Sequence, residues 1–187
     1  MILTPDNEYT AVLDACVLLP MPLCDTLLRL AEEPSLYRPL WSSVILDEIE
    51  RNLSGKFGYT TDQAKRRISA MRLTFPEAEI YIPPELLKAF DCIPDEHDRH
   101  VLAAADRGGA HAIVTHNIKH FPEDCLQRFD ILCQSPDEFL VHQFHISPGE
   151  VITKIEEQAD NIGEDVSALI QSLAKTVPQF AKLLLHK

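Results

Sequence analysis

The chain has 187 residues, of which 45% are hydrophobic, 29 are acidic and 17 are basic, giving a formal net charge of −12. This length and hydrophobic content predict one folded domain with room for an appendage, and they argue against intrinsic disorder. The acidic total argues against nonspecific nucleic-acid binding by the whole surface, although a nucleic-acid enzyme with a local basic strip stays compatible with it.

The sequence also argues against membrane and secretory classes. No apolar run approaches the ~20 residues that a membrane span needs, and residues 1–8 lack the basic region and apolar core of a signal peptide. The five cysteines are odd in number and form no CxxC pair. We therefore expect a cytoplasmic protein with no membrane contact, and buried thiols in place of a disulfide framework or a zinc cage.

Short apolar runs alternate with amphipathic segments through residue 143. Such runs are typical of buried parallel strands, and amphipathic segments are typical of the helices that cover them. The expected strands are residues 9–14, 37–41, 80–82, 112–115 and 129–133. The expected helices are residues 25–33, 44–53, a basic helix that Thr60 opens, 85–90, an acidic helix at 95–107, and 136–142. This alternation predicts an α/β/α sandwich with a mostly parallel central sheet.

Polar motifs mark where several of these helices begin. Ser42 or Ser43 is the expected cap of the helix at 44–53, and Asp95 is the expected cap of the acidic helix. A serine or threonine followed three residues later by glutamate or glutamine is a capping box. This motif occurs at Thr60 with Gln63, at Ser135 with Glu138 and at Ser147 with Glu150.

Residues 147–187 have the apolar spacing of a C-terminal helical extension, which Gly163 and Pro178 are expected to break into pieces. We therefore divide the chain into a domain at residues 1–146 and an extension at residues 147–187. The apolar stripe of the extension must be covered by the domain itself, by a second copy or by a partner. The sequence leaves these three alternatives open.

Three acidic residues stand on or beside apolar elements in distant parts of the chain. Asp14 ends the first strand, Glu48 lies on the helix at 44–53, and Asp98 falls in the first turn of the acidic helix. Each has an ordinary explanation alone: a solvated turn, a surface position, or a favourable interaction with the helix dipole. Because functional sites of parallel sheets gather at the strand ends, the three together predict a site for a hard divalent cation, which prefers carboxylate oxygens.

Two histidine pairs offer a zinc site as an alternative. His116 and His120 are four residues apart, and His97 and His100 are three apart, which are spacings that zinc sites use. The first pair lies in an expected loop and lacks the glutamate of the metalloprotease pattern. Zinc is therefore the weaker interpretation.

Converging carboxylates suit the hydrolysis of phosphodiesters. The reaction needs an activated water and relief of negative charge at phosphorus, and one or two Mg²⁺ ions supply both. Without a metal, mutual repulsion raises the pKa values of neighbouring acids. The metal-free protein is therefore expected to be less stable where all the acids are ionised.

Four motifs occur in an order that resembles a PIN domain. They are Val12-Leu13-Asp14 and the segments at residues 41–49, 94–105 and 112–122. The resemblance covers about residues 8–143. It implies an endoribonuclease that depends on Mg²⁺ or Mn²⁺, very often the VapC-type toxin of a bacterial toxin–antitoxin pair.

The resemblance also implies roles for individual residues. Asp14, Glu48 and Asp98 match the three family acids, which would hold the ion that activates water, and Asp95 matches an additional acid.

The resemblance to a PIN domain also extends to Thr115 and Asn117. Thr115 matches a hydroxyl that precedes a fourth metal position, which is usually aspartate and here is Asn117. An amide is a neutral oxygen donor, so one negative charge is missing. We therefore expect one tight metal site, with any second ion bound weakly or brought by the substrate phosphate.

One helix carries the only dense basic stretch, which is either a solvated face or a contact for the RNA backbone. Its basic residues are Lys65, Arg66, Arg67 and Arg72. The expected substrate is a structured RNA such as tRNA. The resemblance further implies a cognate antitoxin that reaches the acidic pocket, and a homodimer.

Two rival functions stay open. Asn117 favours a PIN-like module that has lost activity and works by contact with RNA or protein. A weaker alternative is an aspartyl-phosphate phosphatase with Asp14 as nucleophile. That class needs a second aspartate two residues later, where this chain has Cys16.

Overall fold

A computed structural model describes residues 9–186 of the chain. Residues 1–8, where no signal peptide is predicted, and residue 187 lie outside the described residues. Five parallel strands form one sheet in the order β3-β2-β1-β4-β5. The strands are β1 (Thr10–Leu13), β2 (Arg38–Ser42), β3 (Glu79–Ile80), β4 (Ala112–Val114) and β5 (Leu132–Gln134). The predicted sandwich class and the predicted parallel sheet are confirmed.

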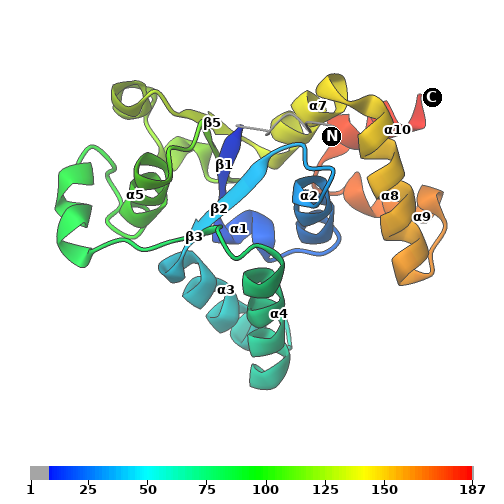
Figure 1. Ribbon diagram of the computed structural model, residues 1–187, viewed down its shortest axis with the longest axis horizontal. Helices are drawn as coiled ribbons and strands as arrows, with labels where there is room; N and C mark the ends of the chain where they lie inside the picture. Colours follow the sequence, from blue (N-terminus) through cyan, green and yellow to red (C-terminus); the bar gives the residue numbers. More distant parts are fainter. Residues whose placement is uncertain (1–8, 187) are drawn as a thin grey trace, which may run out of the picture.

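Helices cover both faces of this sheet. The α-helices are α1 (Ala15–Leu18), α2 (Leu23–Ala31), α3 (Ser43–Lys56), α4 (Thr61–Thr74), α5 (Arg99–Gly108), α6 (Glu123–Leu126), α7 (Pro136–Ile146), α8 (Pro148–Ile162), α9 (Val166–Leu173) and α10 (Pro178–Leu185). The 3-10 helices are η1 (Pro84–Phe90), η2 (Ile118–His120) and η3 (Gln127–Phe129). Helix α5 packs against β1, β2 and β4, whereas α2 lies on the opposite side, next to α8 (Figure 1). Across residues 9–186, no helix is both long enough and apolar enough to cross a bilayer.

The central strand β1 is completely buried, which explains its run of apolar residues. Val12 pairs with Leu40 of β2 on one side and with Ile113 of β4 on the other. Strand β1 therefore places whatever follows it at the middle of the sheet edge, where its two neighbours also end.

Most predicted caps are present. The Ser42 hydroxyl accepts a hydrogen bond from the Ile45 amide, and the boxes at Thr60 and Ser135 are both complete. The predicted box at Ser147 is wrong, because its side chain makes no capping bond. Ser147 also ends α7, where its amide donates to the carbonyl of Gln143 at 3.1 Å, so its backbone is set by the preceding helix.

The acidic helix begins later than predicted. Helix α5 starts at Arg99, and the expected cap Asp95 instead accepts a hydrogen bond from the His97 amide at 2.9 Å. That bond closes a local turn, which is the usual competitor of helix capping for aspartate. Asp98 therefore precedes α5 directly, and its carboxylate makes no capping bond.

Several short elements carry no periodic signal in the sequence. Helix α1 directly after β1 was not predicted, and the expected loop at 117–126, for which the sequence allows one turn of helix, contains both η2 and α6. Residues 84–90 are a 3-10 helix, where an ordinary helix was expected. A single helical turn is too short for a 3.6-residue pattern to appear.

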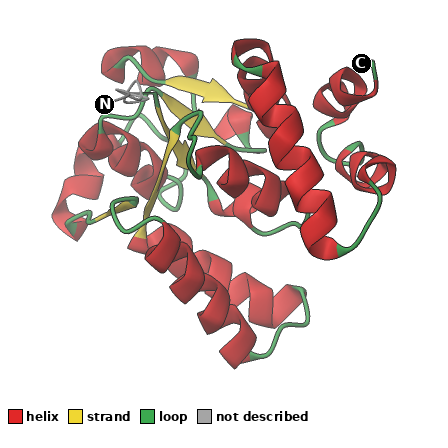
Figure 2. Cartoon of the chain, turned by 45° about the vertical axis from the view of Figure 1, so that its right-hand side comes forward, coloured by secondary structure: helices red, strands yellow, loops and turns green. Residues whose placement is uncertain are grey.

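The C-terminal helices pack on the domain itself, which answers the question of what covers their apolar stripe. The Gln158 side chain of α8 accepts a bond from the Thr26 hydroxyl at 2.7 Å and donates to the Pro22 carbonyl at 3.1 Å. Lys154, also buried, donates to the Glu33 carbonyl. Figure 2 shows these helices at one side of the molecule, where α8 contacts α2 and α10 contacts α7. The predicted breaks are confirmed, because Gly163 ends α8 and Pro178 begins α10.

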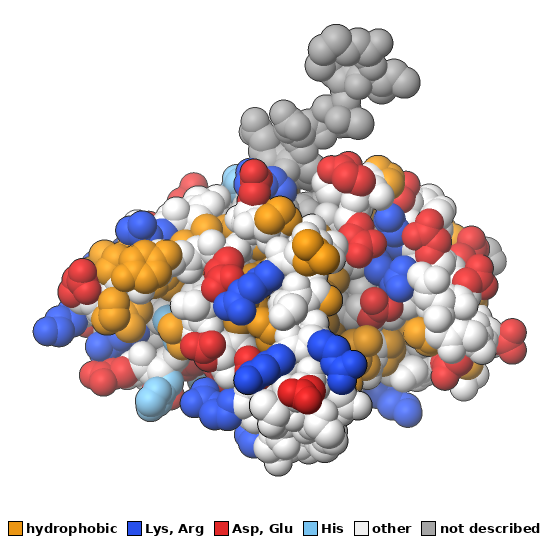
Figure 3. All heavy atoms as spheres, turned by 60° about the horizontal axis from the view of Figure 1, so that its bottom comes forward, with side chains coloured by type: hydrophobic (Ala, Val, Ile, Leu, Met, Phe, Trp, Pro, Cys, Tyr) orange, Lys and Arg blue, Asp and Glu red, His pale blue; other side chains and the backbone are white. Residues whose placement is uncertain are grey.

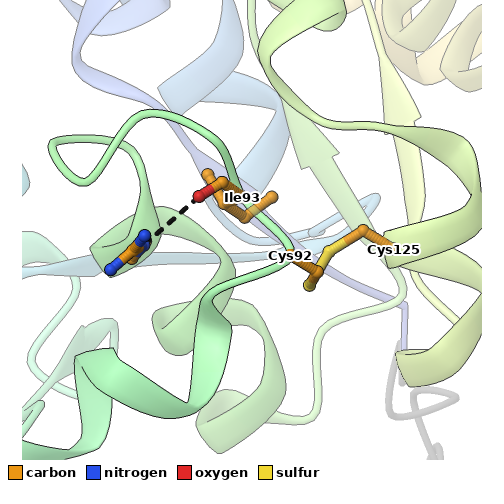
Figure 4. Close-up of a disulfide and its surroundings, with 4 residues drawn as sticks. Cys92, Ile93 and Cys125 are labelled. Atoms are coloured by element: carbon orange, nitrogen blue, oxygen red, sulfur yellow. Dashed lines mark hydrogen bonds between the residues drawn. A yellow bond between two sulfur atoms is a disulfide. The ribbon is translucent and has the colours of Figure 1, made fainter.

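The expectation of free buried thiols is wrong for one cysteine pair. Cys92, in the segment before α5, is bonded to Cys125 of α6 with their Cα atoms 5.6 Å apart (Figure 4). The adjoining Ile93 carbonyl accepts a hydrogen bond from Arg99 Nε at 3.2 Å. Cysteine spacing alone carries no information on such a pairing. Of the thiols, Cys24 is fully buried, and two others are only half-buried.

Candidate active site

The site is built at the ends of the two central strands. Asp14 directly follows β1, and Thr115 directly follows β4, its neighbour in the sheet. The Thr115 hydroxyl donates to Oδ2 of Asp14 at 2.6 Å, and the Asp14 amide donates to the Val114 carbonyl at 3.1 Å. Asp14 is 6% exposed and Thr115 is fully buried. The structure therefore brings together two residues that the sequence predicted at one sheet edge.

Cys16 is a third member of this cluster, and sequence reasoning did not assign it to the site. Its sulfur donates to Oδ2 of Asp14 at 3.1 Å, lies 3.4 Å from the Thr115 hydroxyl, and accepts a bond from the His116 amide. Burial, reinforced by the charge of Asp14, raises the pKa of Cys16 to about 12. The thiol is thus neutral and acts as a hydrogen-bond donor to the carboxylate. The sequence signal for this contact is the position of Cys16, two residues after Asp14.

Asp98 comes from another part of the fold, directly before α5. Its Oδ2 atom lies 2.8 Å from Nδ1 of His120, which belongs to η2. The side chain of Asp98 is 20% exposed and that of His120 is 35% exposed. The sequence pattern indicates His120 only as one member of a zinc-spaced pair with His116. Its ring faces a carboxylate instead.

Glu48 on α3 is electrostatically coupled to both aspartates. Burial is the main cause that raises the pKa of Glu48, and the negative charges of Asp14 and Asp98 raise it further. Arg51 and Lys56 act in the opposite direction. Glu48 therefore lies within electrostatic reach of both aspartates, although Asp14 follows β1 and Asp98 precedes α5.

A buried histidine, His100, lies within electrostatic reach of Asp14 and Asp98. His100 is 6% exposed, and its Nδ1 is 3.4 Å from the Ser42 hydroxyl. Burial lowers the pKa of His100, against the opposing charges of Asp14 and Asp98. Burial therefore favours the neutral form of this imidazole.

The two remaining predicted metal ligands make local hydrogen bonds. Asp95 is exposed, and its only side-chain hydrogen bond within residues 9–186 is the local one to the His97 amide. Asn117 is half-buried and donates its amide to the Thr115 hydroxyl at 3.0 Å. Asn117 thus supports the Thr115 hydroxyl through its backbone.

The acids suit a hard cation by chemistry, but they do not form a finished cage. Within the described part of the chain, no three Asp, Glu, His or Cys side chains converge into a ready cation site. Carboxylate and amide oxygens are nevertheless the ligands that Mg²⁺ and Mn²⁺ prefer. Because like charges near Glu48 already raise its pKa, a bound cation would relieve an existing repulsion.

The predicted basic stretch is partly used for internal contacts. Arg67 donates to the Leu18 and Leu19 carbonyls at the end of α1, and Arg72 forms two bonds with Glu79 at 2.7 and 3.0 Å. Lys65 and Arg66 are exposed. On the face that Figure 3 presents, lysine and arginine side chains alternate with acidic ones and form no continuous strip.

Two family models and one curated relative match this chain. Residues 10–119 match the model of a PIN domain, and residues 136–186 match the VapC50 C-terminal domain. A Mycobacterium tuberculosis protein named "Putative ribonuclease VapC50" is 40% identical over 87 residues, which are 45% of this chain and 52% of that protein. The chain thus spans about half the length of the curated relative it matches. No solved structure matched the chain. The chain belongs to the PIN-domain family.

Proposed function

We propose that this protein is a metal-dependent endoribonuclease that hydrolyses RNA phosphodiester bonds as the toxin of a type II toxin–antitoxin pair. Membership of the PIN-domain family and the relative named as a ribonuclease support this function. The observation that carries it is the electrostatic coupling of Glu48 to Asp14 and Asp98. Glu48 of α3 lies within electrostatic reach of Asp14, which follows β1, and of Asp98, which precedes α5.

Asp14, Glu48 and Asp98 would hold Mg²⁺ or Mn²⁺, with Asp95 and Asn117 at the margin of the site. When bound, the ion supplies an activated water and neutralises charge on the phosphate. The neutral Asn117 favours one tightly held ion over two. Thr115 and Cys16 fix Oδ2 of Asp14 and leave Oδ1 without a hydrogen bond from any described residue.

The substrate and partners belong to the same proposal. A structured RNA such as tRNA would approach the acids, and the exposed Lys65 and Arg66 of α4 would contact its phosphates. A cognate antitoxin would present cationic side chains to the acidic pocket. We further propose a homodimer and a cytoplasmic location.

The test is RNA cleavage by purified Asp14→Asn and Asp98→Asn variants with Mg²⁺ or Mn²⁺, and with EDTA. Both variants and EDTA should abolish cleavage while circular dichroism stays unchanged. Asp106→Asn changes an exposed acid of α5 and is the matched control, which should cleave like the unmodified protein. Cleavage retained by both site variants would contradict the proposal.

One observation favours a second candidate, a binding module without catalysis. The fourth metal position is Asn117, and the described acids form no finished cation site. Such a module would show neither cleavage nor any rise in thermal stability on titration with Mn²⁺. Stabilisation by Mn²⁺ together with cleavage would exclude it.

A further inference from the structure

The loop that follows β4 reaches both aspartates of the site, one with each of its ends. Thr115 at its start donates to Oδ2 of Asp14 at 2.6 Å. His120 at its end places Nδ1 at 2.8 Å from Oδ2 of Asp98. In each carboxylate, one oxygen is therefore hydrogen-bonded to a side chain of this loop.

The position of His120 is fixed by the fold of this loop. The His120 amide donates to the Asn117 carbonyl at 2.9 Å, and the Asn117 amide donates to the Thr115 hydroxyl at 3.0 Å. The next residue, Phe121, is 3% exposed and anchors the end of the loop in the core. His120 therefore meets Asp98 through a chain of local bonds that begins at Thr115.

The carboxylate of Asp98 is available for this contact because it does not cap α5. Within residues 9–186, His120 is the only side-chain hydrogen-bond partner of Asp98, and Oδ1 accepts no bond. An ionised carboxylate accepts hydrogen bonds and cannot donate them, so Nδ1 carries the hydrogen in either charge state of the ring. Hydrogen bonds of this kind orient carboxylates that ligate metals and influence metal affinity.

We propose that His120 is a positioning residue that holds Oδ2 of Asp98 and leaves Oδ1 to the cation, as Thr115 does for Asp14. This inference rests on the proposed function, which requires the cation. The imidazole acts through Nδ1 on Asp98, which is a metal ligand in this proposal, and it is not proposed to contact RNA. The loop after β4 thereby orients two ligands of one site.

Three substitutions separate the two ring nitrogens. His120→Asn places an amide N–H near the position of Nδ1, His120→Gln places one near Nε2, and His120→Ala removes both. His145→Ala changes an exposed histidine of α7 and is the matched control. The measurement is calorimetric titration of the full chain with Mn²⁺ alone, followed by RNA cleavage across a range of Mn²⁺ concentrations.

The Kd for Mn²⁺ should rise about tenfold or more in the alanine and glutamine variants and stay within about threefold in the asparagine variant. Cleavage by the alanine variant should recover at saturating Mn²⁺. Unchanged Mn²⁺ affinity in the alanine variant overturns the role of His120 and leaves the proposed function standing. The role is also overturned if glutamine preserves affinity and asparagine does not, because Nε2 would then be the working atom. Absence of Mn²⁺ binding by the unmodified protein overturns the proposed function, and this inference with it.

Discussion

The hydroxyl of Thr115 lies 2.6 Å from Oδ2 of Asp14, so two parallel strands are joined just beyond their last backbone pairing. Both side chains are buried, and the short distance is typical of a hydroxyl bonded to an ionised oxygen. This contact fixes the orientation of the central acid before any ligand arrives.

Thr115→Val keeps the shape of this side chain and removes its donor. The variant should lose about 1.5–3 kcal/mol of unfolding free energy, because a hydrogen bond to a buried charged group is lost. Its affinity for Mn²⁺ should fall by about tenfold. Thr115→Ser keeps the hydroxyl and should stay close to the unmodified protein in both urea unfolding and Mn²⁺ titration. Equal behaviour of the valine and serine variants would show that the bond has no such role.

Glu48→Gln should stabilise the metal-free protein while it removes activity. The pKa of Glu48 is raised in the folded state, so the folded protein binds this proton more tightly than the unfolded protein does. Stability from this group is therefore lost as pH rises through the folded pKa. The gain from glutamine should be below about 1 kcal/mol, because solvent screens this half-exposed group.

Thermal unfolding with EDTA at pH 7 and at pH 3.5 checks this expectation. The variant should unfold at a higher temperature than the unmodified protein at pH 7, and the difference should vanish at pH 3.5, where Glu48 is protonated. Asp47→Asn, an exposed neighbour on α3, is the control and should not reproduce the gain. A destabilised Glu48→Gln protein at pH 7 would argue against repulsion among the acids.

His100 should make the fold sensitive to mild acid. Burial lowers its pKa, so the unfolded protein takes up a proton at a higher pH than the folded protein does. Stability is therefore complete above the unfolded value of about 6.5 and declines as pH falls below it. His100→Gln removes this proton uptake. Urea unfolding at pH 7.5 and 5.5 should show a smaller loss for the variant, and an equal loss in both proteins would contradict the assignment.

Asp137→Ala should destabilise the C-terminal helices. The Asp137 carboxylate, 7% exposed, accepts bonds from the Gln179 and Phe180 amides at 3.1 and 2.9 Å, at the first turn of α10. Leaving the buried Phe180 amide without a partner costs on the order of 2 kcal/mol or more. Asp137→Asn keeps one acceptor oxygen and should lose less, whereas the exposed control Asp124→Ala should lose little. Hydrogen exchange at Phe180 is the local measurement, and unchanged protection in the alanine variant would refute this role.

The sequence predicted the centre of the site because that centre follows from strand order. Asp14 and Thr115 each end an apolar run, and parallel strands end at one edge. The contacts around this centre depend on short segments without periodicity. In the sequence, Asp95 fits a helix cap and Asp98 fits a first-turn position equally well. The turn formed in the folded chain places Asp98, and not Asp95, next to α5. The pairing of His120 with Asp98 and the bond between Cys92 and Cys125 join segments whose approach no local pattern encodes.

The hydrogen bonds between Gln158 and residues Thr26 and Pro22 would be lost if the C-terminal helices were removed by truncation. A polypeptide ending at residue 146 would leave the Thr26 hydroxyl facing solvent together with the apolar flank of α2. Because α2 contacts α1, and α1 begins one residue after Asp14, damage there would reach the acids. An inactive fragment of this kind would therefore report on a lost packing surface and would say nothing about chemistry.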